Sequence, residues 1–124
     1  MVVAVGVDLV EMDRVARALS RWGSRFLGKI LAPEEAARLP FGEAQVEAVA
    51  FAIAAKEAAS KCIGTGWSRG VRWRDVVVAL SPSPSVRLDA RAAHFASLRG
   101  SRGGTRTVLE RRGNLVIGQV FLLA

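Results

Sequence analysis

Residues 43–63 read EAQVEAVAFAIAAKEAASKCI, and Gly64-Thr65-Gly66 follows directly. The stretch is rich in alanine, the residue that favours helices most, and glycine is common just past the end of a helix. We therefore expect one long helix, Glu43–Ile63, that ends at Gly64. Glu57 and Lys61 lie four residues apart within it, which places both side chains on one helix face.

Apolar segments near both ends of the chain predict β-strands. Three strands are expected: Val2–Val7, which ends at Asp8, Thr105–Leu109, and Leu115–Leu123. The last is almost wholly apolar and is expected to be central in its sheet, with a turn at residues 112–114 before it. Because strands and helices do not alternate regularly, we expect an α+β fold, an antiparallel sheet with a long central helix, in one domain over residues 1–124.

Shorter elements are expected between these. A helix is expected from Asp13, with an apolar face formed by Val15, Leu19, Trp22 and Phe26. A second helix is expected to start at Pro33-Glu34-Glu35, and a third, capped by Asp89, to cover Asp89–Leu98. Between these two, a strand is expected over Val71–Leu80 and a turn over residues 81–84. The first of these helices carries a second stripe, formed by Arg14, Arg17, Arg21 and Arg25. This stripe is either a docking surface for an acidic partner helix or a solvated face.

The composition is typical of a globular domain, and we expect a cytoplasmic setting. Of the 124 residues 51% are hydrophobic, which excludes a disordered chain. The single cysteine, Cys62, excludes an internal disulfide and a metal site built from cysteines. The longest strictly apolar run, Ala48–Ala55, is far shorter than the roughly 20 residues that span a bilayer. The apolar start Met1–Val7 has no basic region before it, so no signal peptide is expected.

The net charge is strongly positive. The formal charge is +7, and fifteen of the 18 basic residues are arginine. Arginine favours bidentate pairing with carboxylates and phosphates, so an acidic or phosphorylated partner is expected. An acidic protein, a nucleotide or a nucleic acid would each satisfy the charge. The basic cluster within residues 99–112 has no interleaved aromatic side chains, which weakens the nucleic-acid alternative.

Asp8 and Glu57 are the candidate metal ligands. Each carboxylate lies among apolar neighbours, where it needs a cation or takes up a proton. Together they could hold one Mg²⁺, which prefers oxygen ligands and keeps waters for a substrate phosphate. Lys61 could offset charge on a diphosphate leaving group. The alternative is structural: a Glu57–Lys61 salt bridge within the helix and a capping role for Asp8.

Two segments of the sequence resemble motifs of a known protein family. Val5-Gly6-Val7-Asp8-Leu9-Val10-Glu11-Met12 is similar to the opening motif of the holo-acyl-carrier-protein synthases, the small 4'-phosphopantetheinyl transferases. Residues 53–61, IAAKEAASK, followed by Gly64-Thr65-Gly66, resemble the family signature F-A-A-K-E-A-x-x-K-A-x-G-T-G. Phe26–Glu35 and Trp73–Val76 resemble two further family segments, so the similarity spans nearly the whole chain.

The resemblance implies a Mg²⁺-dependent enzyme. It would transfer the phosphopantetheine arm of coenzyme A to a serine of an acyl carrier protein and release 3',5'-ADP. By position, Asp8 and Glu57 would bind Mg²⁺, Glu57 would also act through a water as the base on the serine, and Lys61 would bind the diphosphate. Family members of this length are trimers with sites between subunits.

The resemblance also assigns the surroundings of this site. Lys56 and Gly64 would lie at the nucleotide, and Glu11 would help to order the site. The helix with Arg14, Arg17, Arg21 and Arg25 would meet the acidic carrier protein, a role that fits its charge.

The chain departs from the family pattern at the nucleotide end. Ala52 stands where the family usually has arginine, and Val108-Leu109-Glu110-Arg111 stands where it has S-L-S-H. Arg106, Arg111 or Arg112 could replace the lost positive charge, although Glu110 beside them would repel phosphate. We therefore expect a holo-acyl-carrier-protein synthase with an altered nucleotide pocket. The alternative is a non-catalytic or weakly active member that binds the carrier protein or a ligand like coenzyme A.

Overall fold

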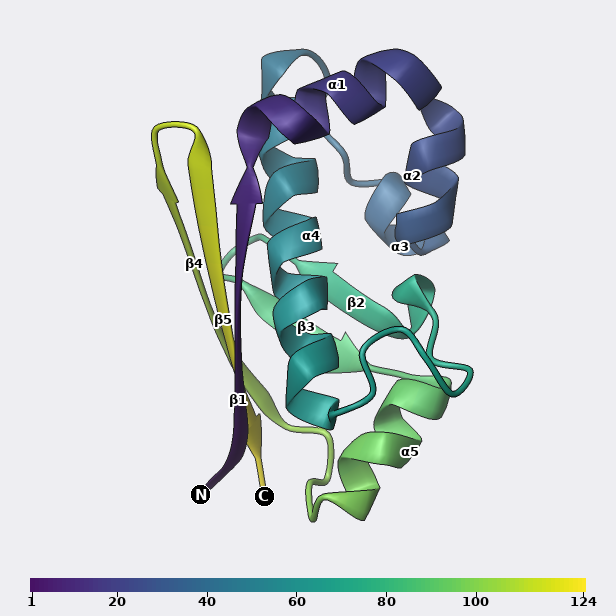
Figure 1. Ribbon diagram of the computed structural model, residues 1–124, viewed down its shortest axis with the longest axis vertical. Coiled ribbons are helices and arrows are strands. Elements are labelled where there is room, and N and C mark those ends of the chain that lie inside the picture. Colours follow the sequence, from purple (N-terminus) through teal and green to yellow (C-terminus); the bar gives the residue numbers. More distant parts are fainter.

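A long helix and two antiparallel sheets form the framework of the fold. The computed structural model describes residues 1–124. The larger sheet has the strand order β1-β5-β4, with β1 at Val2–Glu11, β4 at Thr105–Arg112 and β5 at Leu115–Leu123. Helix α4, Glu43–Ile63, runs along one face of this sheet (Figure 1). Strands β1 and β5 therefore both pack against α4.

The smaller elements surround α4. β2 (Val76–Ala79) and β3 (Ser85–Leu88) form the second sheet, and a 3₁₀ turn at Trp73–Asp75 precedes it. Helices α1 (Met12–Trp22), α2 (Ser24–Ile30) and α3 (Pro33–Ala36) lie together beside the first half of α4, and α5 (Ala90–Leu98) lies near its end (Figure 1). No helix of the chain has the combination of length and apolar character that crossing a bilayer requires.

Two glycines let the sheet approach α4 closely. Asp8 lies opposite Gly118 in the register of β1 and β5. Because strand side chains alternate between faces, Gly6 and Asp8 share the face toward α4. A Cβ on Gly6 would overlap the carbonyl oxygen of Ala58, and a Cβ on Gly118 would lie 2.9 Å from that of Ala54. Strand and helix backbones are therefore in contact beside Asp8.

The structure confirms the main predicted elements. Helix α4 begins at Glu43 and ends at Ile63, and Gly64 closes it in the left-handed conformation, at φ 81°. β5 is central in its sheet, and residues 81–84 form no helix or strand between β2 and β3. β1 and β4 run further than predicted, to Glu11 and Arg112, because both pair with β5 as far as Leu115.

The helix predicted from Asp13 is two helices. Gly23, at φ 49°, separates α1 from α2, so the predicted apolar spacing does not continue unbroken to Phe26. Trp22 was expected on the apolar face, but 50% of it is exposed. The guanidinium of Arg21 lies 5.0 Å from its ring centroid, so Trp22 supports the arginine stripe instead of the core.

The prediction of a strand over Val71–Leu80 is wrong for its first half, where a 3₁₀ turn at Trp73–Asp75 precedes β2. The Asp75 carboxylate accepts hydrogen bonds from the backbone and guanidinium of Arg72, which closes the 3₁₀ turn before β2 begins. Strand β3 was not predicted, because four residues between turns carry too short a pattern. Asp89 precedes α5 as expected, but its carboxylate pairs with Arg87 and makes no capping hydrogen bond.

Candidate active site

Asp8 and Lys61 form an ion pair across the β1–α4 contact. Lys61 Nζ lies 3.0 Å from Asp8 Oδ1 and donates a second hydrogen bond, of 2.9 Å, to the carbonyl oxygen of Val7. The Asp8 side chain is 20% exposed and that of Lys61 is 52% exposed. The ammonium group therefore retains a solvent-facing side from which it can reach a ligand.

Glu57 lies one helical turn before Lys61 and is half-buried. Burial raises the pKa of its carboxyl, and the negative charge of nearby Asp8 raises this pKa further, while the Trp67 indole and Lys61 act in the opposite direction. Glu57 forms no ion pair with Lys61, and Glu11, not Asp8, precedes α1 at its N-cap. The two contacts of the structural alternative, a Glu57–Lys61 salt bridge and a cap by Asp8, are therefore not formed.

The chemistry of the pair Asp8 and Glu57 fits Mg²⁺. Two carboxylates that disfavour each other's negative charge would both be stabilised by a shared cation. The chain has no group of three or more His, Cys, Asp or Glu side chains that could hold a metal. Mg²⁺ is commonly bound by only one or two carboxylates, with waters and substrate phosphates completing its coordination. The site has the ligand set expected for a metal that is shared with a phosphate substrate.

Trp67 lies beside the last turns of α4 and was not singled out in the sequence analysis. Its ring stacks on that of Trp73, with centroids 4.1 Å apart and planes at 15°. Its indole nitrogen is buried and has no hydrogen-bond partner. The signal in the sequence was a tryptophan directly after Gly64-Thr65-Gly66, within reach of the last turns of α4.

Lys56 does not face the candidate site. Its side chain is fully buried, and Nζ donates to Glu35 Oε1 at 2.8 Å, to the Trp73 carbonyl oxygen at 2.9 Å and to the Val76 carbonyl oxygen at 2.5 Å. Burial lowers the pKa of Lys56, and the neighbouring Glu35 and Asp75 carboxylates oppose this effect. All three donors of an ammonium group are used, so the predicted nucleotide contact of Lys56 is not available here.

Gly64 is a helix terminus held by an arginine. Arg99 donates from Nη1 to the Cys62 carbonyl oxygen at 2.9 Å, and a Cβ on Gly64 would lie 2.6 Å from Nη2 of the same guanidinium. A cation at the last carbonyl groups of a helix is favourable. Arg99 therefore closes α4 beside Lys61, and Gly64 leaves it the room to do so.

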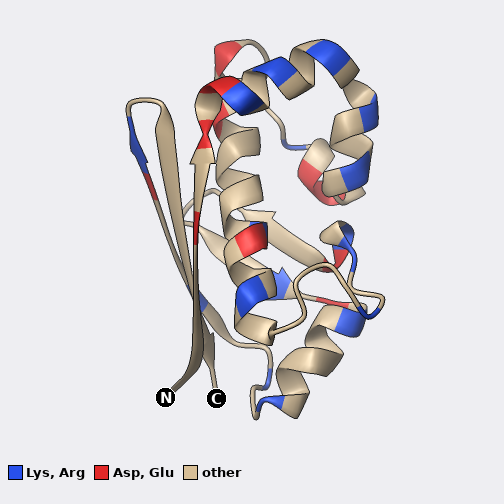
Figure 2. Cartoon of the chain, in the orientation of Figure 1, with Lys and Arg blue, Asp and Glu red and all other residues tan.

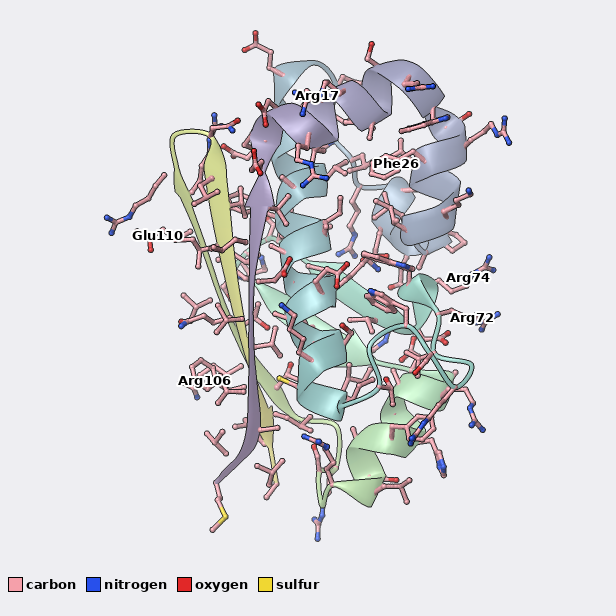
Figure 3. The ribbon with its side chains drawn as sticks, in the orientation of Figure 1. Arg17, Phe26, Arg72, Arg74, Arg106 and Glu110 are labelled. Carbon is pink, nitrogen blue, oxygen red and sulfur yellow. The ribbon has the colours of Figure 1, made fainter.

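Arg106 lies on the opposite face of the sheet from Asp8. Figure 3 shows Arg106 and Glu110 pointing from β4 away from α4. Val108 shares this outer face and is 47% exposed, and Glu110 pairs there with Arg112 at 2.9 Å. Within one chain the structure does not bring Arg106 to the carboxylate pair.

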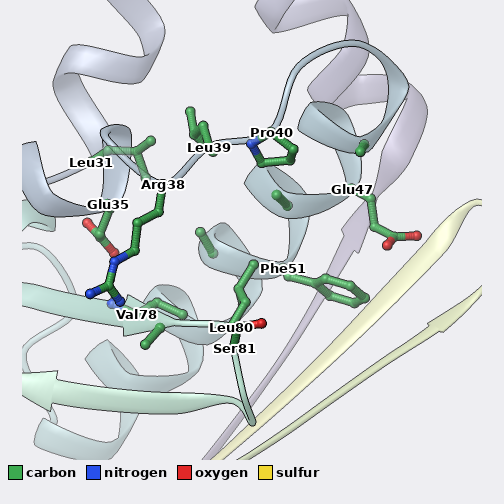
Figure 4. A pocket seen from close by; sticks show the side chains of 14 residues that line it. Leu31, Glu35, Arg38, Leu39, Pro40, Glu47, Phe51, Val78, Leu80 and Ser81 are labelled. Carbon is green, nitrogen blue, oxygen red and sulfur yellow. The ribbon is translucent and has the colours of Figure 1, made fainter.

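Arg111 and Ala52 lie near a cavity on the other side of α4. The cavity has a volume of about 430 Å³, and Glu47, Phe51 and Ala52 line it (Figure 4). Arg111 Nη1 pairs with Glu47 Oε2 at 2.7 Å. Arg111 is therefore linked through Glu47 to the cavity that Ala52 lines, and neither Asp8 nor Glu57 lines this cavity.

The arginine stripe is exposed along its whole length. Arg14, Arg17, Arg21 and Arg25 are all exposed on α1 and α2 (Figure 2). Only Arg17 forms an ion pair, at 3.5 Å from the neighbouring Asp13 on the same helix. Glu11, expected to order the site, is exposed and forms no hydrogen bond or ion pair through its side chain.

Comparisons with known proteins agree on one family. A model described as 4'-phosphopantetheinyl transferase superfamily matches residues 4–114. The holo-[acyl-carrier-protein] synthase of Solibacter usitatus is 42% identical over 102 residues, which cover 81% of this chain and 82% of the relative. The range of the family match includes Asp8, Glu57 and Lys61.

Solved structures show the same fold. The crystal structure of holo-[acyl-carrier-protein] synthase from Neisseria meningitidis matches with a TM-score of 0.87 at 25% identity and covers 100% of both chains. A holo-(acyl-carrier-protein) synthase from Bacillus anthracis, in complex with CoA (3',5'-ADP), matches with a TM-score of 0.77 at 26% identity over 98% of this chain and 96% of that one. The expected α+β architecture is confirmed.

Proposed function

The chain belongs to the holo-acyl-carrier-protein synthases of the 4'-phosphopantetheinyl transferase superfamily, and from this premise we propose that Asp8, Glu57 and Lys61 carry out the transfer. The reaction moves the phosphopantetheine arm of coenzyme A to a serine of an acyl carrier protein. The serine oxygen bonds to the phosphorus that carries the arm, and the bond from this phosphorus to the nucleotide phosphate breaks. The other product is 3',5'-ADP.

Asp8 and Glu57 are the residues proposed to hold Mg²⁺. When bound, the metal supplies Lewis acidity and positive charge at the diphosphate oxygens. The two carboxylates approach from a strand and a helix whose backbones are in contact, so their relative position is fixed before any ligand binds. Such preorganisation lowers the cost of assembling the site.

Lys61 is proposed to bind the diphosphate. Its ammonium already neutralises Asp8 at 3.0 Å and keeps a solvent-exposed side. A fixed positive charge at this point stabilises the negative charge that develops on the leaving phosphate. Its hydrogen bond to the Val7 carbonyl oxygen limits the directions in which Nζ can move.

Glu57 is proposed to receive the proton of the serine hydroxyl through a water. Burial raises the pKa of this carboxyl. A carboxylate with a raised pKa is a stronger base than one in water. The same residue thus serves as ligand and as base.

The active assembly is proposed to be a trimer. Val5, Val7 and Leu9 of β1 and Val108 of β4 are 44–58% exposed on the sheet face that points away from α4. An apolar sheet face of this kind marks an interaction surface, and two further copies of the chain are its proposed occupants. Arg106 lies on the same face, so in a trimer it is available to a neighbouring copy's site.

The nucleotide end is proposed to use Arg111. Ala52 supplies no positive charge at a position where the family usually has arginine, and Arg38 is the one basic residue that lines the cavity beside α4. Arg111 lies near this cavity, held by Glu47 at 2.7 Å. We propose that a nucleotide phosphate competes with Glu47 for this guanidinium, which can pair with either group.

The single observation that carries this function is the meeting of Asp8, Glu57 and Lys61 in a chain of this family. The test incubates apo acyl carrier protein with coenzyme A, Mg²⁺ and the enzyme, and weighs the intact carrier by mass spectrometry. The wild type should add one phosphopantetheine arm per carrier. Glu57→Gln should add none, because it removes a charged ligand and the base while it preserves shape. Glu43→Gln, which changes an exposed carboxylate at the start of α4, is the matched control.

Calorimetry of coenzyme A binding, measured with and without Mg²⁺, distinguishes the active enzyme from a non-catalytic member of the family. Metal-dependent binding together with transfer supports the enzyme. Binding without any transfer, even at high enzyme concentration, would instead identify a non-catalytic member of the family. Full transfer by Glu57→Gln would remove Glu57 from the mechanism.

A further inference from the structure

The indole of Trp67 has a buried donor without a protein acceptor. Its Nε1 is inaccessible to solvent and forms no hydrogen bond in the chain. Buried donors in folded proteins nearly always have a partner, so an unpaired one at a functional site calls for an explanation.

The position of the Trp67 ring is fixed from two sides. The ring stacks on Trp73 at 4.1 Å, and the preceding Gly66 donates its backbone N–H to the Ser60 carbonyl oxygen of α4 at 3.2 Å. Trp73 in turn is tied to α4, because its carbonyl oxygen accepts a hydrogen bond from Lys56 Nζ at 2.9 Å. The stacked pair therefore moves with the last two turns of α4.

The carboxylate beside this donor is that of Glu57. Glu57 precedes Ser60 by three residues on α4, so its side chain lies on the helix face to which Gly66 is bonded, and its carboxylate accepts no hydrogen bond in the chain. A donor placed against a half-buried carboxylate restricts the rotation of that carboxylate and satisfies one of its oxygens. Metal-binding carboxylates are commonly oriented by hydrogen bonds of this kind.

We propose that Trp67 is a positioning residue for Glu57: its indole N–H hydrogen-bonds one carboxylate oxygen and leaves the other free for Mg²⁺. This inference rests on the proposed function, because it assigns Glu57 to the metal. Trp67 itself touches neither substrate nor metal. The stacked Trp73 supplies the matched control, since it shares the ring contact but has no unpaired buried N–H.

The first experiment needs no metal. In ¹⁵N-labelled protein the three tryptophans give three indole N–H signals, which the Trp→Phe variants assign. Glu57→Gln should shift the Trp67 signal and leave that of Trp22 unchanged, and the Trp67 proton should exchange slowly with solvent. A Trp67 signal that does not respond to Glu57→Gln overturns the proposal.

The second experiment measures Mn²⁺ binding to the protein alone by electron paramagnetic resonance. Loss of an orienting partner commonly weakens metal binding by 10–100-fold, so Trp67→Phe should raise the dissociation constant by about tenfold while Trp73→Phe leaves it nearly unchanged. Equal affinity in the wild type and Trp67→Phe overturns the positioning role but leaves the proposed function intact. Equal losses in both Phe variants indicate loop repacking and also overturn it. A wild type that binds no Mn²⁺, either alone or with coenzyme A present, overturns the metal site of the proposed function itself.

Discussion

Gly6 of β1 lies against the backbone of Ala58 in α4 so closely that a Cβ on Gly6 would overlap the Ala58 carbonyl oxygen. Asp8 follows Gly6 by two residues on the same strand face, and Glu57 precedes Ala58 by one residue. The separation of the two carboxylates is therefore set by this contact between strand and helix.

Gly6→Ala should impair both stability and metal use. The added Cβ would clash with the backbone carbonyl of Ala58, which cannot rotate away as a side chain can. Strand and helix must therefore separate, at a cost of about 1–3 kcal/mol. Asp8 then moves away from Glu57 and Lys61. We expect a lower midpoint in chemical denaturation and a higher Mg²⁺ requirement in the transfer assay. Gly28→Ala is the control, because no atom lies within 4 Å of the added Cβ there; similar behaviour of the two variants would contradict the argument.

Val7→Asp should prevent assembly. Val7 is 44% exposed on the outer sheet face, between Val5 and Leu9, and an unpaired carboxylate buried in an apolar interface is costly. We expect a trimeric mass for the wild type and a monomeric mass for the variant by light scattering, with transfer lost in parallel. Leu98→Asp, at a 68% exposed position on α5, should assemble normally. A wild type that is monomeric at all concentrations would exclude the trimer.

Lys56→Met should destabilise the fold without acting on the chemistry directly. The substitution leaves the Glu35 carboxylate buried without its cation, although the backbone N–H groups of Ala32 and Val78 still donate to it, each at 2.7 Å. Removing one partner of a buried pair typically costs about 3–5 kcal/mol. Glu35→Gln together with Lys56→Met should recover part of this loss, as measured by denaturation. An activity loss at unchanged stability would instead return Lys56 to the nucleotide site.

The interior of α4 explains why some of this site was predictable and some was not. The alanine-rich stretch and Gly64 determine the helix by local chemistry alone, and Glu57 and Lys61 share a face because the helical period is regular. Lys56 is one residue from Glu57 but points elsewhere. Of the residues three and four positions away, Ala52, Ala59 and Ser60 are buried and Ile53 is half-buried, so the small residues on this helix face were a signal that Lys56 is buried too.

Other features depend on contacts that no local pattern contains. Gly23 interrupts an otherwise continuous apolar spacing, and glycine inside a helical pattern can be tolerated or can end it. Trp67 faces Glu57 because its loop folds back onto Ser60 and Trp73, a choice made by tertiary packing. Arg106 and Arg111 are five residues apart on β4, and the odd spacing places them on opposite sheet faces. Grouping them in one phosphate site overlooked that alternation.

Arg87→Ala should change the pH dependence of stability. Arg87 pairs with Glu34 at 2.7 Å and with Asp89 at 2.9 Å, and this guanidinium holds the pKa of both carboxyls below their usual range. A carboxyl with a lowered pKa stabilises the fold above its unfolded pKa, and this contribution is lost as pH falls through the folded pKa. The free energy of unfolding of the wild type should therefore exceed that of the variant most at neutral pH. This difference in stability should shrink below about pH 4. Carboxyl NMR titration should show both pKa values rising in the variant.

Arg14→Glu should weaken recognition of the carrier protein without altering the chemistry. Arg14 is exposed and has no ion-pair partner in the chain, and an acidic residue in the first turn of α1 is favourable to the helix, so the fold should not suffer. Charges at an interface act mainly on association and on its salt dependence. We expect the KM for the carrier protein to rise about tenfold with kcat nearly unchanged, and the difference from the wild type to diminish in high salt, where the screening length falls to about 3 Å. Arg102→Glu makes the same charge change at an exposed position before β4, and it should leave this KM unchanged. If both variants raise the KM equally, net charge and not the arginine stripe attracts the carrier.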